Sequence, residues 1–376
     1  METLPNITHK ILEAAKKVGY RSHEGVAGTF FQIDHKVVVS KINEMFKGKL
    51  EVLDTRDAIK KYRWVSKLLW KFVDKDKDAF TRSVYSAEKS NWENVAGYFI
   101  RILPNSEVTF PIQSCIVLAK QDSTQRVHNI IVAEKGSRAN IITGCTIHPD
   151  ITSGQHLGIS EFLIKENASL NFTMIHNWAS NTDVKPRSAA IIEENGRFVS
   201  NYICTSPVKD LQMHPKITCK GKNSSTRISS IIYAQKGSRI DIGSGVELFG
   251  ENSSAEIISR TIAKENSQVM VKGSIHGKGK NSRGYLECKG ILLDDTSFIH
   301  AIPELIGSRS DIDLSHEAAV GKINEDAIIY LMTRGLNEEE ARSLLISGFL
   351  DVDILGLPEN LATEIKQYIK KTAKAY

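Results

Sequence analysis

The segment that decides the fold is IVAEKGSRANI at residues 131–141, together with its near-copy IYAQKGSRIDI at residues 232–242. Each copy has an apolar run, a short polar turn around a glycine, and a second run in which apolar and polar residues alternate. Glycine tolerates the left-handed backbone angles that such a turn needs. The pattern predicts a strand, a tight turn and a second strand with one buried face.

The same unit recurs with asparagine at the turn, as in FLIKENASLNF at 162–172 and IIEENGRFV at 191–199, and further copies centre on Asn252, Asn266 and Thr296. The intervals between these turns are 31, 28, 42, 15, 14 and 30 residues, all close to multiples of 14 or 15. Stacked units of this kind bury a continuous core. The spacing predicts a mainly β chain with a central β-helix, or β-solenoid; the alternative is a β-sandwich, whose spacing is usually less regular.

Helical patterns flank this β region. Apolar residues recur at helical spacing in residues 6–18 and 54–72, and three further helices are expected from about Asn324, Asn337 and Pro358. The pattern indicates three regions: a mixed, partly helical region at 1–94, a β-helix core at 95–308, and a helical region at 309–376.

Composition and charge exclude several classes of protein. The chain is 41% hydrophobic and 25% charged, which is typical of a globular protein. Its net charge of +5 is spread through segments of mixed sign, whereas a nucleic-acid-binding protein gathers lysine and arginine into one stripe. No run of 18 apolar residues and no secretory leader pattern are present, so we expect a cytoplasmic protein that does not enter a membrane.

The five cysteines are scattered, odd in number and free of any C-x-x-C motif, so we expect reduced thiols and no tetrahedral zinc site. Cys288 lies in YLECKGILL at 285–293, where alternation places it opposite Tyr285, Glu287 and Lys289. Local sequence alone favours a buried, inert thiol. The pair His316 and Glu317 follows just ahead of the C-terminal helices, and imidazole and carboxylate could join a thiolate in binding iron.

A second candidate group surrounds Cys145, with His156 eleven residues further on, but no ligand spacing there is diagnostic. The segment GSIHGKG at 273–279 has three residues rather than four between its glycines, and no Ser or Thr follows the lysine. It therefore fails the phosphate-loop pattern, and the chain is not itself expected to be an ATPase.

Residues from about 97 to 349, and above all the stretch from Cys288 through His316 and Glu317 to the helical segment ending at Gly335, resemble the SufB/SufD family of iron-sulfur cluster assembly proteins. The resemblance implies a central β-helix between helical ends, in agreement with the repeat spacing. Cys288 and Glu317 match positions at which SufB differs from SufD, so the chain resembles SufB more closely.

The resemblance further implies a scaffold rather than an enzyme, which would build a transient iron-sulfur cluster on Cys288, His316 and Glu317 at a dimer interface. It implies that Cys145 and His156 accept and transfer sulfur from a donor protein. The implied partners are a SufC-like ABC-class ATPase, docked on the C-terminal helices, and a second SufB/SufD-type subunit in a homodimer or heterodimer. Whether a flavin takes part is left open.

The chain also departs from bacterial SufB. It is shorter, lacks an N-terminal cysteine cluster, continues with His148 and Pro149 after Cys145, and has His176 where glutamine is common. Two alternatives remain: a SufD-like structural or regulatory subunit in which Cys288 is merely buried, and a β-helix carbohydrate-active enzyme, which would need a groove of clustered acidic residues.

Overall fold

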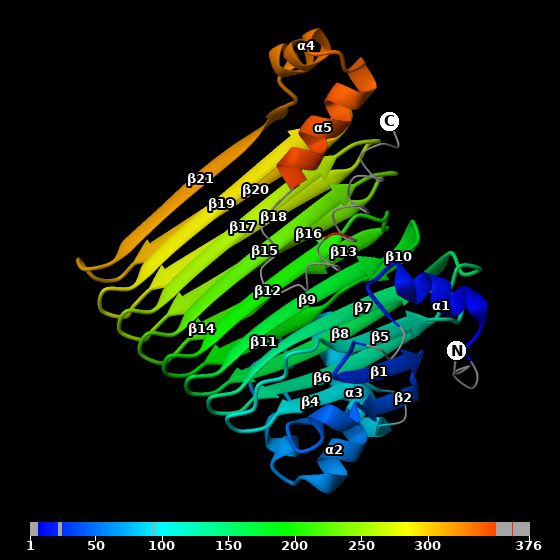
Figure 1. Ribbon diagram of the computed structural model, residues 1–376, viewed down its shortest axis with the longest axis vertical. Helices are drawn as coiled ribbons and strands as arrows, with labels where there is room; N and C mark the ends of the chain where they lie inside the picture. The colour runs from blue at the N-terminus through cyan, green and yellow to red at the C-terminus, as the bar shows by residue number, and fades with distance from the viewer. Residues whose placement is uncertain (1–6, 22–24, 93–94, 351–362, 364–376) are drawn as a thin grey trace.

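Two stacked β-sheets form the body of the protein, as the computed structural model shows (Figure 1). The structure describes residues 7–21, 25–92, 95–350 and 363. Along most of the chain the strands pass back and forth between the sheets, so that one coil adds one strand to the first sheet and one or two to the second. The neighbours within each sheet are parallel and in register over most of the stack. The predicted β-solenoid is therefore confirmed.

Sheet A forms one wall of the solenoid and ends at β21. Its strands, in spatial order, are β2 (Lys36–Ile42), β1 (Gly28–Ile33), β5 (Ile112–Leu118), β7 (Arg138–Ile147), β9 (Ser169–Asn177), β12 (Arg197–Cys204), β15 (Ser225–Ala234), β17 (Ser254–Ala263), β19 (Arg283–Leu292) and β21 (Asp313–Lys322).

Sheet B forms the opposite wall and ends at β20. Its strands are β3 (Leu50–Asp54), β4 (Tyr98–Ile102), β6 (Thr124–Ala133), β8 (Ser153–Ile164), β10 (Asn181–Val184), β11 (Arg187–Ile192), β13 (Asp210–Met213), β14 (Lys216–Cys219), β16 (Arg239–Leu248), β18 (Gln268–Gly277) and β20 (Phe298–Gly307). With β1 to β3 at one end and β21 at the other, the two sheets extend beyond residues 95–308 in both directions.

The core lies between the sheets and follows from strict alternation. Along β16 and β18 every second residue is buried, and Val269 and Val271 are 1% and 2% exposed, as the sequence pattern predicts. Burial of these apolar faces is the main force that holds successive coils together.

Asparagines stack at one edge of the solenoid, where the chain turns from sheet B to sheet A. Each adopts a positive φ, and every one after Asn167 donates a hydrogen bond from its Nδ2 to the Oδ1 of the asparagine one coil earlier, over distances of 3.0–3.4 Å. The repeat of 14 or 15 residues is thus half a coil, since turns alternate between the two edges. This asparagine ladder comprises Asn167, Asn195, Asn223, Asn252 and Asn281.

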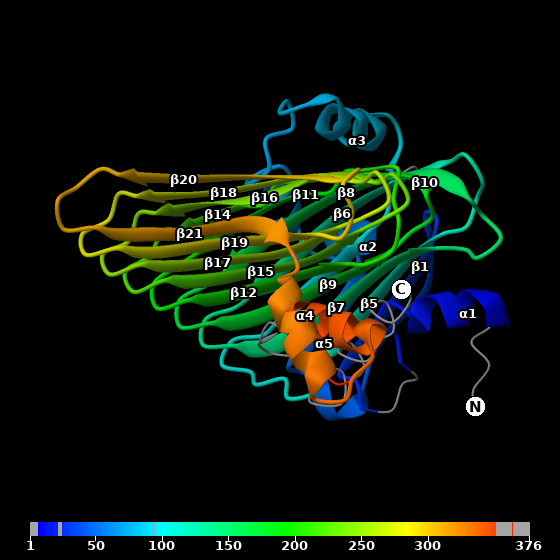
Figure 2. The ribbon, with the colours of Figure 1, turned by 90° about the horizontal axis from the view of Figure 1, so that it is seen from above.

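Helices cover the outer faces of both sheets (Figure 2). Helix α3 (Ala79–Ser90) contacts sheet B, whereas α1 (His9–Lys16) and α5 (Glu338–Leu350) contact sheet A. Helix α4 (Glu325–Thr333) begins after the cap Asn324, as predicted, and packs on α5. The helix expected from Pro358 lies outside the described residues.

The single helix predicted for residues 54–72 is wrong. Helix α2 (Thr55–Lys61) stops before Tyr62, which is extended, and a short 3₁₀ turn (Val65–Lys67) follows. Tyr62 and Trp64 pack their rings against Phe99 of sheet B. This aromatic packing on the sheet overrides the local helical periodicity.

We expect the asparagine ladder to stabilise the turns measurably. Replacing Asn223 by alanine removes two side-chain hydrogen bonds and leaves a Cβ at φ 55°, whereas replacement by glycine removes only the hydrogen bonds. Unfolding in urea should show a loss of about 2 kcal/mol for Asn223→Ala and about 1 kcal/mol for Asn223→Gly. Equal losses in the two variants would show that the backbone conformation contributes nothing.

Candidate functional site

Cys288 lies on β19, near the end of the solenoid. Its side chain faces the interior with Leu286, and the residue is 2% exposed. Burial raises the pKa of the Cys288 thiol to about 11, so the thiol is protonated at neutral pH in the isolated chain. A bound cation would reverse this preference, because metals bind the thiolate.

His316 and Glu317 lie on β21, the last strand of sheet A. His316 is in register with Leu286, so it faces the same side of the sheet as Cys288, and it is exposed because no described strand lies beyond β21. Cys288 and His316 are diagonal neighbours on adjacent strands, which places their Cα atoms roughly 8 Å apart. The structure therefore brings the thiol and the imidazole to one face.

Glu317 faces the opposite way, on the outer surface of sheet A. Its carboxylate lies 2.9 Å from Lys289 Nζ and accepts a hydrogen bond of 3.1 Å from the Tyr285 hydroxyl. Lys289 Nζ also lies 2.8 Å from Glu287, which pairs in turn with Arg260 on β17. We call this set, Glu317, Lys289, Glu287 and Arg260, the outer-face ladder.

The second candidate group lies deep inside the solenoid. Cys145 on β7 and His156 on β8 are each 2% exposed, and burial raises the pKa of Cys145 to about 12 and lowers that of His156 to about 4. His176 connects them: it is in register with Cys145, and its ring centroid lies 6.1 Å from that of His156. These two predicted residues are therefore brought together through a histidine.

The two candidate groups are well separated. Five strand spacings of sheet A lie between β7 and β19, so Cys145 and Cys288 are about 24 Å apart along the stack. In the register column of Cys288, Ser259 and Ser230 face the interior and form a hydrogen bond of 2.9 Å, and Tyr202 follows next.

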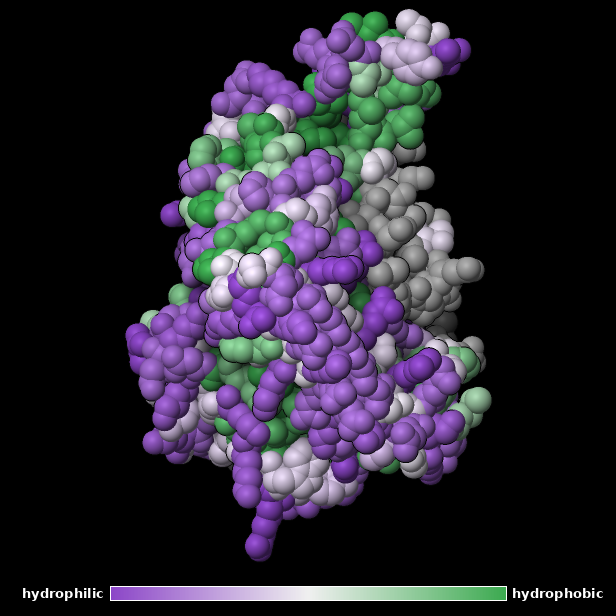
Figure 3. Space-filling view, turned by 90° about the vertical axis from the view of Figure 1, so that its left-hand side faces the viewer, coloured by the Kyte–Doolittle hydropathy of each residue, from purple (hydrophilic) through white to green (hydrophobic). Residues whose placement is uncertain are grey.

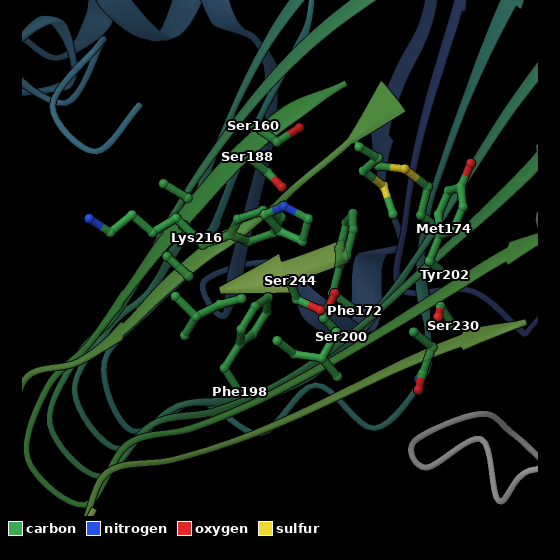
Figure 4. Close-up of a pocket in the computed structure, with 18 of the residues that line it drawn as sticks. Ser160, Phe172, Met174, Ser188, Phe198, Ser200, Tyr202, Lys216, Ser230 and Ser244 are labelled. Carbon is green, nitrogen blue, oxygen red and sulfur yellow. The ribbon is translucent and has the colours of Figure 1, made fainter. Parts of the chain in front are cut away.

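A small cavity of about 40 Å³ lies between the sheets, in the part of the solenoid between Cys145 and Cys288 (Figure 4). Aromatic rings and serine hydroxyls line it together, among them Phe172, Phe198, Ser200 and Ser244. The interior is therefore not uniformly apolar between the two thiols.

A buried charged cluster on the outer face of sheet B was not predicted from the sequence. His128 is fully buried, with Nδ1 2.6 Å from Glu88 and Nε2 2.9 Å from Glu161. Glu161 also accepts backbone hydrogen bonds from Trp70, at 2.6 Å, and Phe72, at 2.6 Å. The cluster fastens the N-terminal region to the solenoid. The hydrogen-bonded pairs named here are 33 or more residues apart in sequence, so no local motif reveals the cluster.

Within the described ranges, no group of three or more His, Cys, Asp and Glu side chains is arranged to hold a metal ion. None of the described helices is long and apolar enough to cross a membrane. The fold and these residues define a parallel β-solenoid protein in which a buried thiol and an exposed imidazole face the same side of one sheet near its C-terminal end.

Comparison with known proteins agrees with this class. The family model described as "SUF system FeS cluster assembly, SufBD core domain" matches residues 116–349. An "Iron-sulfur cluster assembly SufBD family protein" of Archaeoglobus fulgidus is 44% identical over 95% of this chain and 94% of its own length. A relative in Methanothermobacter thermautotrophicus (strain Winter) is 41% identical over 98% of this chain and 89% of its own, and one in Staphylococcus saprophyticus is 28% identical over 92% and 74%.

The chain therefore belongs to the SufBD family of iron-sulfur cluster assembly proteins. The archaeal relatives match over nearly their whole length, which confirms the resemblance recognised in the sequence.

We expect the His128 cluster to make stability depend on pH. The neighbouring carboxylates Glu88 and Glu161 outweigh burial and raise the pKa of His128 to about 9, from an ordinary value near 6.5. The folded state then keeps a proton that the unfolded state has lost, so stability should be fully present below about pH 6.5 and fall as the pH rises to about 9.

Urea unfolding of the wild type and of His128→Gln between pH 6 and pH 9.5 measures this effect. The wild type should lose stability steadily over the window, whereas His128→Gln should be less stable at pH 6 and show a flatter profile. Parallel profiles for the two proteins would contradict the assignment.

Proposed function

We propose that this chain is the scaffold component of a SUF-type system, which builds a nascent iron-sulfur cluster at a dimer interface with the help of an ABC-class ATPase. The observation that supports the proposal most directly is the placement of Cys288 and His316 on one face of the last two strands of sheet A. A thiolate and an imidazole are ligands that suit iron.

One subunit offers an incomplete ligand set. A stable iron-sulfur protein generally supplies four thiolates, whereas a single copy here offers one thiol, one imidazole and the carboxylate of Glu317. A two-fold interface repeats the same patch on both subunits and would double the set. The edges of β20 and β21 are unpaired among the described strands, so this end of the solenoid is available to a second SufB/SufD-type subunit.

Nitrogen and oxygen ligands hold a cluster less firmly than thiolates do, which suits a scaffold that must release its product. Glu317 belongs to the proposed ligand set, but its side chain must leave the outer-face ladder before it can join Cys288 and His316.

Sulfur would enter through Cys145, with His156 and His176 beside it. Because Cys145 and Cys288 are separated by about 24 Å, sulfur could not pass directly from one thiol to the other. A donor protein would deliver it, and intermediate steps along the interior would be required.

The C-terminal helices offer a surface for the ATPase. Apolar side chains are exposed on the α4 and α5 pair, at the upper end of the molecule in Figure 3. The exposed residues are Ile329, Tyr330 and Met332 on α4 and Leu344 on α5, which are 43–58% exposed. Exposed apolar patches of this kind are typical of protein interaction sites.

A second candidate function is that of a SufD-like subunit, which would support the complex without binding the cluster. The burial of Cys288 and its raised pKa favour this alternative, because a protonated, inaccessible thiol is a poor ligand.

Anaerobic reconstitution with iron and sulfide distinguishes the two functions. For the scaffold we expect the purified wild type to acquire a visible chromophore, iron and acid-labile sulfide. Cys288→Ala should lose most of all three, and His316→Ala should bind a cluster that chelators remove faster.

Cys219→Ala is the matched control, since Cys219 is also a fully buried thiol but lies on β14 of sheet B. It should retain the wild-type content. Absence of a chromophore in the wild type, or one that Cys288→Ala leaves unchanged, would reject the scaffold function.

A further inference from the structure

The alternation of β21 separates two residues of the proposed ligand set. His316 faces the interior and Glu317 the outer surface, because successive side chains of a strand point to opposite faces. A slip of β21 by one residue would bring Glu317 inward but would carry His316 outward. Glu317 can therefore join His316 only if it leaves its present partners and β21 departs locally from regular strand geometry.

Glu317 has two partners on the outer face, the Tyr285 hydroxyl and the Lys289 ammonium group, and of these only Lys289 forms an ion pair with it. Lys289 Nζ is shared between two carboxylates, 2.8 Å from Glu287 and 2.9 Å from Glu317. Glu287 is largely buried, with a side chain 9% exposed, whereas the Glu317 side chain is 53% exposed. The strength of the Lys289 to Glu317 pair therefore depends on how well Glu287 is neutralised by its other partner.

That other partner is Arg260, which connects the ladder to helix α5. Arg260 pairs with Glu287, and its guanidinium lies 5.8 Å from the ring centroid of Phe349. The end of α5 is anchored on sheet A, because Ile346 and Leu350 are each 1% exposed within an apolar cluster that includes residues of β15 and β17. A continuous set of contacts thus runs from α5 across β17 and β19 to Glu317 on β21.

We propose that Lys289 and Arg260 are positioning residues, which hold Glu317 on the outer face of sheet A and make that hold depend on the position of helix α5. The proposal rests on the proposed function for the role of Glu317 and for the docking of a partner on α4 and α5. It adds a physical route by which a partner on these helices alters the proposed ligand set.

Competition for Lys289 provides the mechanism. When α5 shifts and Phe349 leaves Arg260, the Arg260 to Glu287 pair is weakened. Glu287 then draws Lys289 more strongly, and Glu317 is released together with the edge strand β21. Because β21 has only β19 as a described strand partner, loss of the Glu317 contact should loosen its backbone.

Amide hydrogen exchange of the full-length, metal-free protein tests this coupling in the segment 313–322. Lys289→Gln removes the ion pair with Glu317 and leaves the hydrogen bond from Tyr285. Arg260→Gln acts one step away, and Phe349→Leu keeps an apolar side chain on α5 but removes the ring. We expect the first two to raise the exchange rate of β21 by roughly two- to fivefold, the range for loss of a partly exposed ion pair. Phe349→Leu should raise it by a smaller factor.

Arg227→Gln is the matched control. Arg227 pairs with Glu256 at 3.4 Å between β15 and β17 on the same outer face, but it is not part of the ladder. It should leave the exchange of β21 unchanged. If Arg260→Gln or Phe349→Leu behaves like Arg227→Gln, the link to α5 is overturned; if Lys289→Gln does so, the hold on Glu317 is overturned.

Thermal unfolding of each variant checks that it is folded, and Phe349→Leu, the mildest change, keeps the test decisive if Arg260→Gln is unstable. The exchange experiment needs no cluster, so its failure is distinct from failure of the proposed function. If the wild type acquires a cluster but the exchange rate of β21 is unchanged in Arg260→Gln and Phe349→Leu, the positioning role alone is rejected.

Discussion

In-register stacking of parallel strands is the constraint on which the rest of this structure depends. Each coil hydrogen-bonds to the coil before it and buries its inward side chains against the same apolar column. A residue can therefore face only the interior or the surface, and its neighbours above and below are fixed by register. This rule places Cys145 beside His176. It also places Cys288 two positions from Leu286, the residue paired with His316.

The same constraint makes the end of the stack chemically distinct. Within the interior coils, the next coil hydrogen-bonds to the backbone and covers the apolar side chains. In the described chain, β20 and β21 have no such neighbour. Side chains that would be buried one coil earlier, such as His316 in the column of Leu286, are exposed there. The imidazole of His316 is thus carried on a rigid core and is still accessible.

The sequence predicted those features that follow from local periodicity. The turn spacing indicated the solenoid, and alternation placed Cys288 opposite Glu287. Asn337 begins the helix expected from it and forms a reciprocal cap with Glu340. The prediction of one helix over residues 54–72 was wrong because contacts with a residue distant in sequence override the local pattern. Tyr62 and Trp64 pack against Phe99 and are not helical. The outer-face ladder was missed for the same reason, because Arg260, Glu287 and Glu317 meet only after three coils are stacked.

A repeating stack also works as a ruler. Because one coil of about 29 residues adds one strand spacing, the separation between the internal thiol and the terminal thiol can change only in steps of about 4.8 Å. Insertion or loss of a complete coil would lengthen or shorten the distance between the two thiols without rotating either sulfur to the surface. An insertion of any other length would have to be looped out at a turn, leaving the span between the thiols intact.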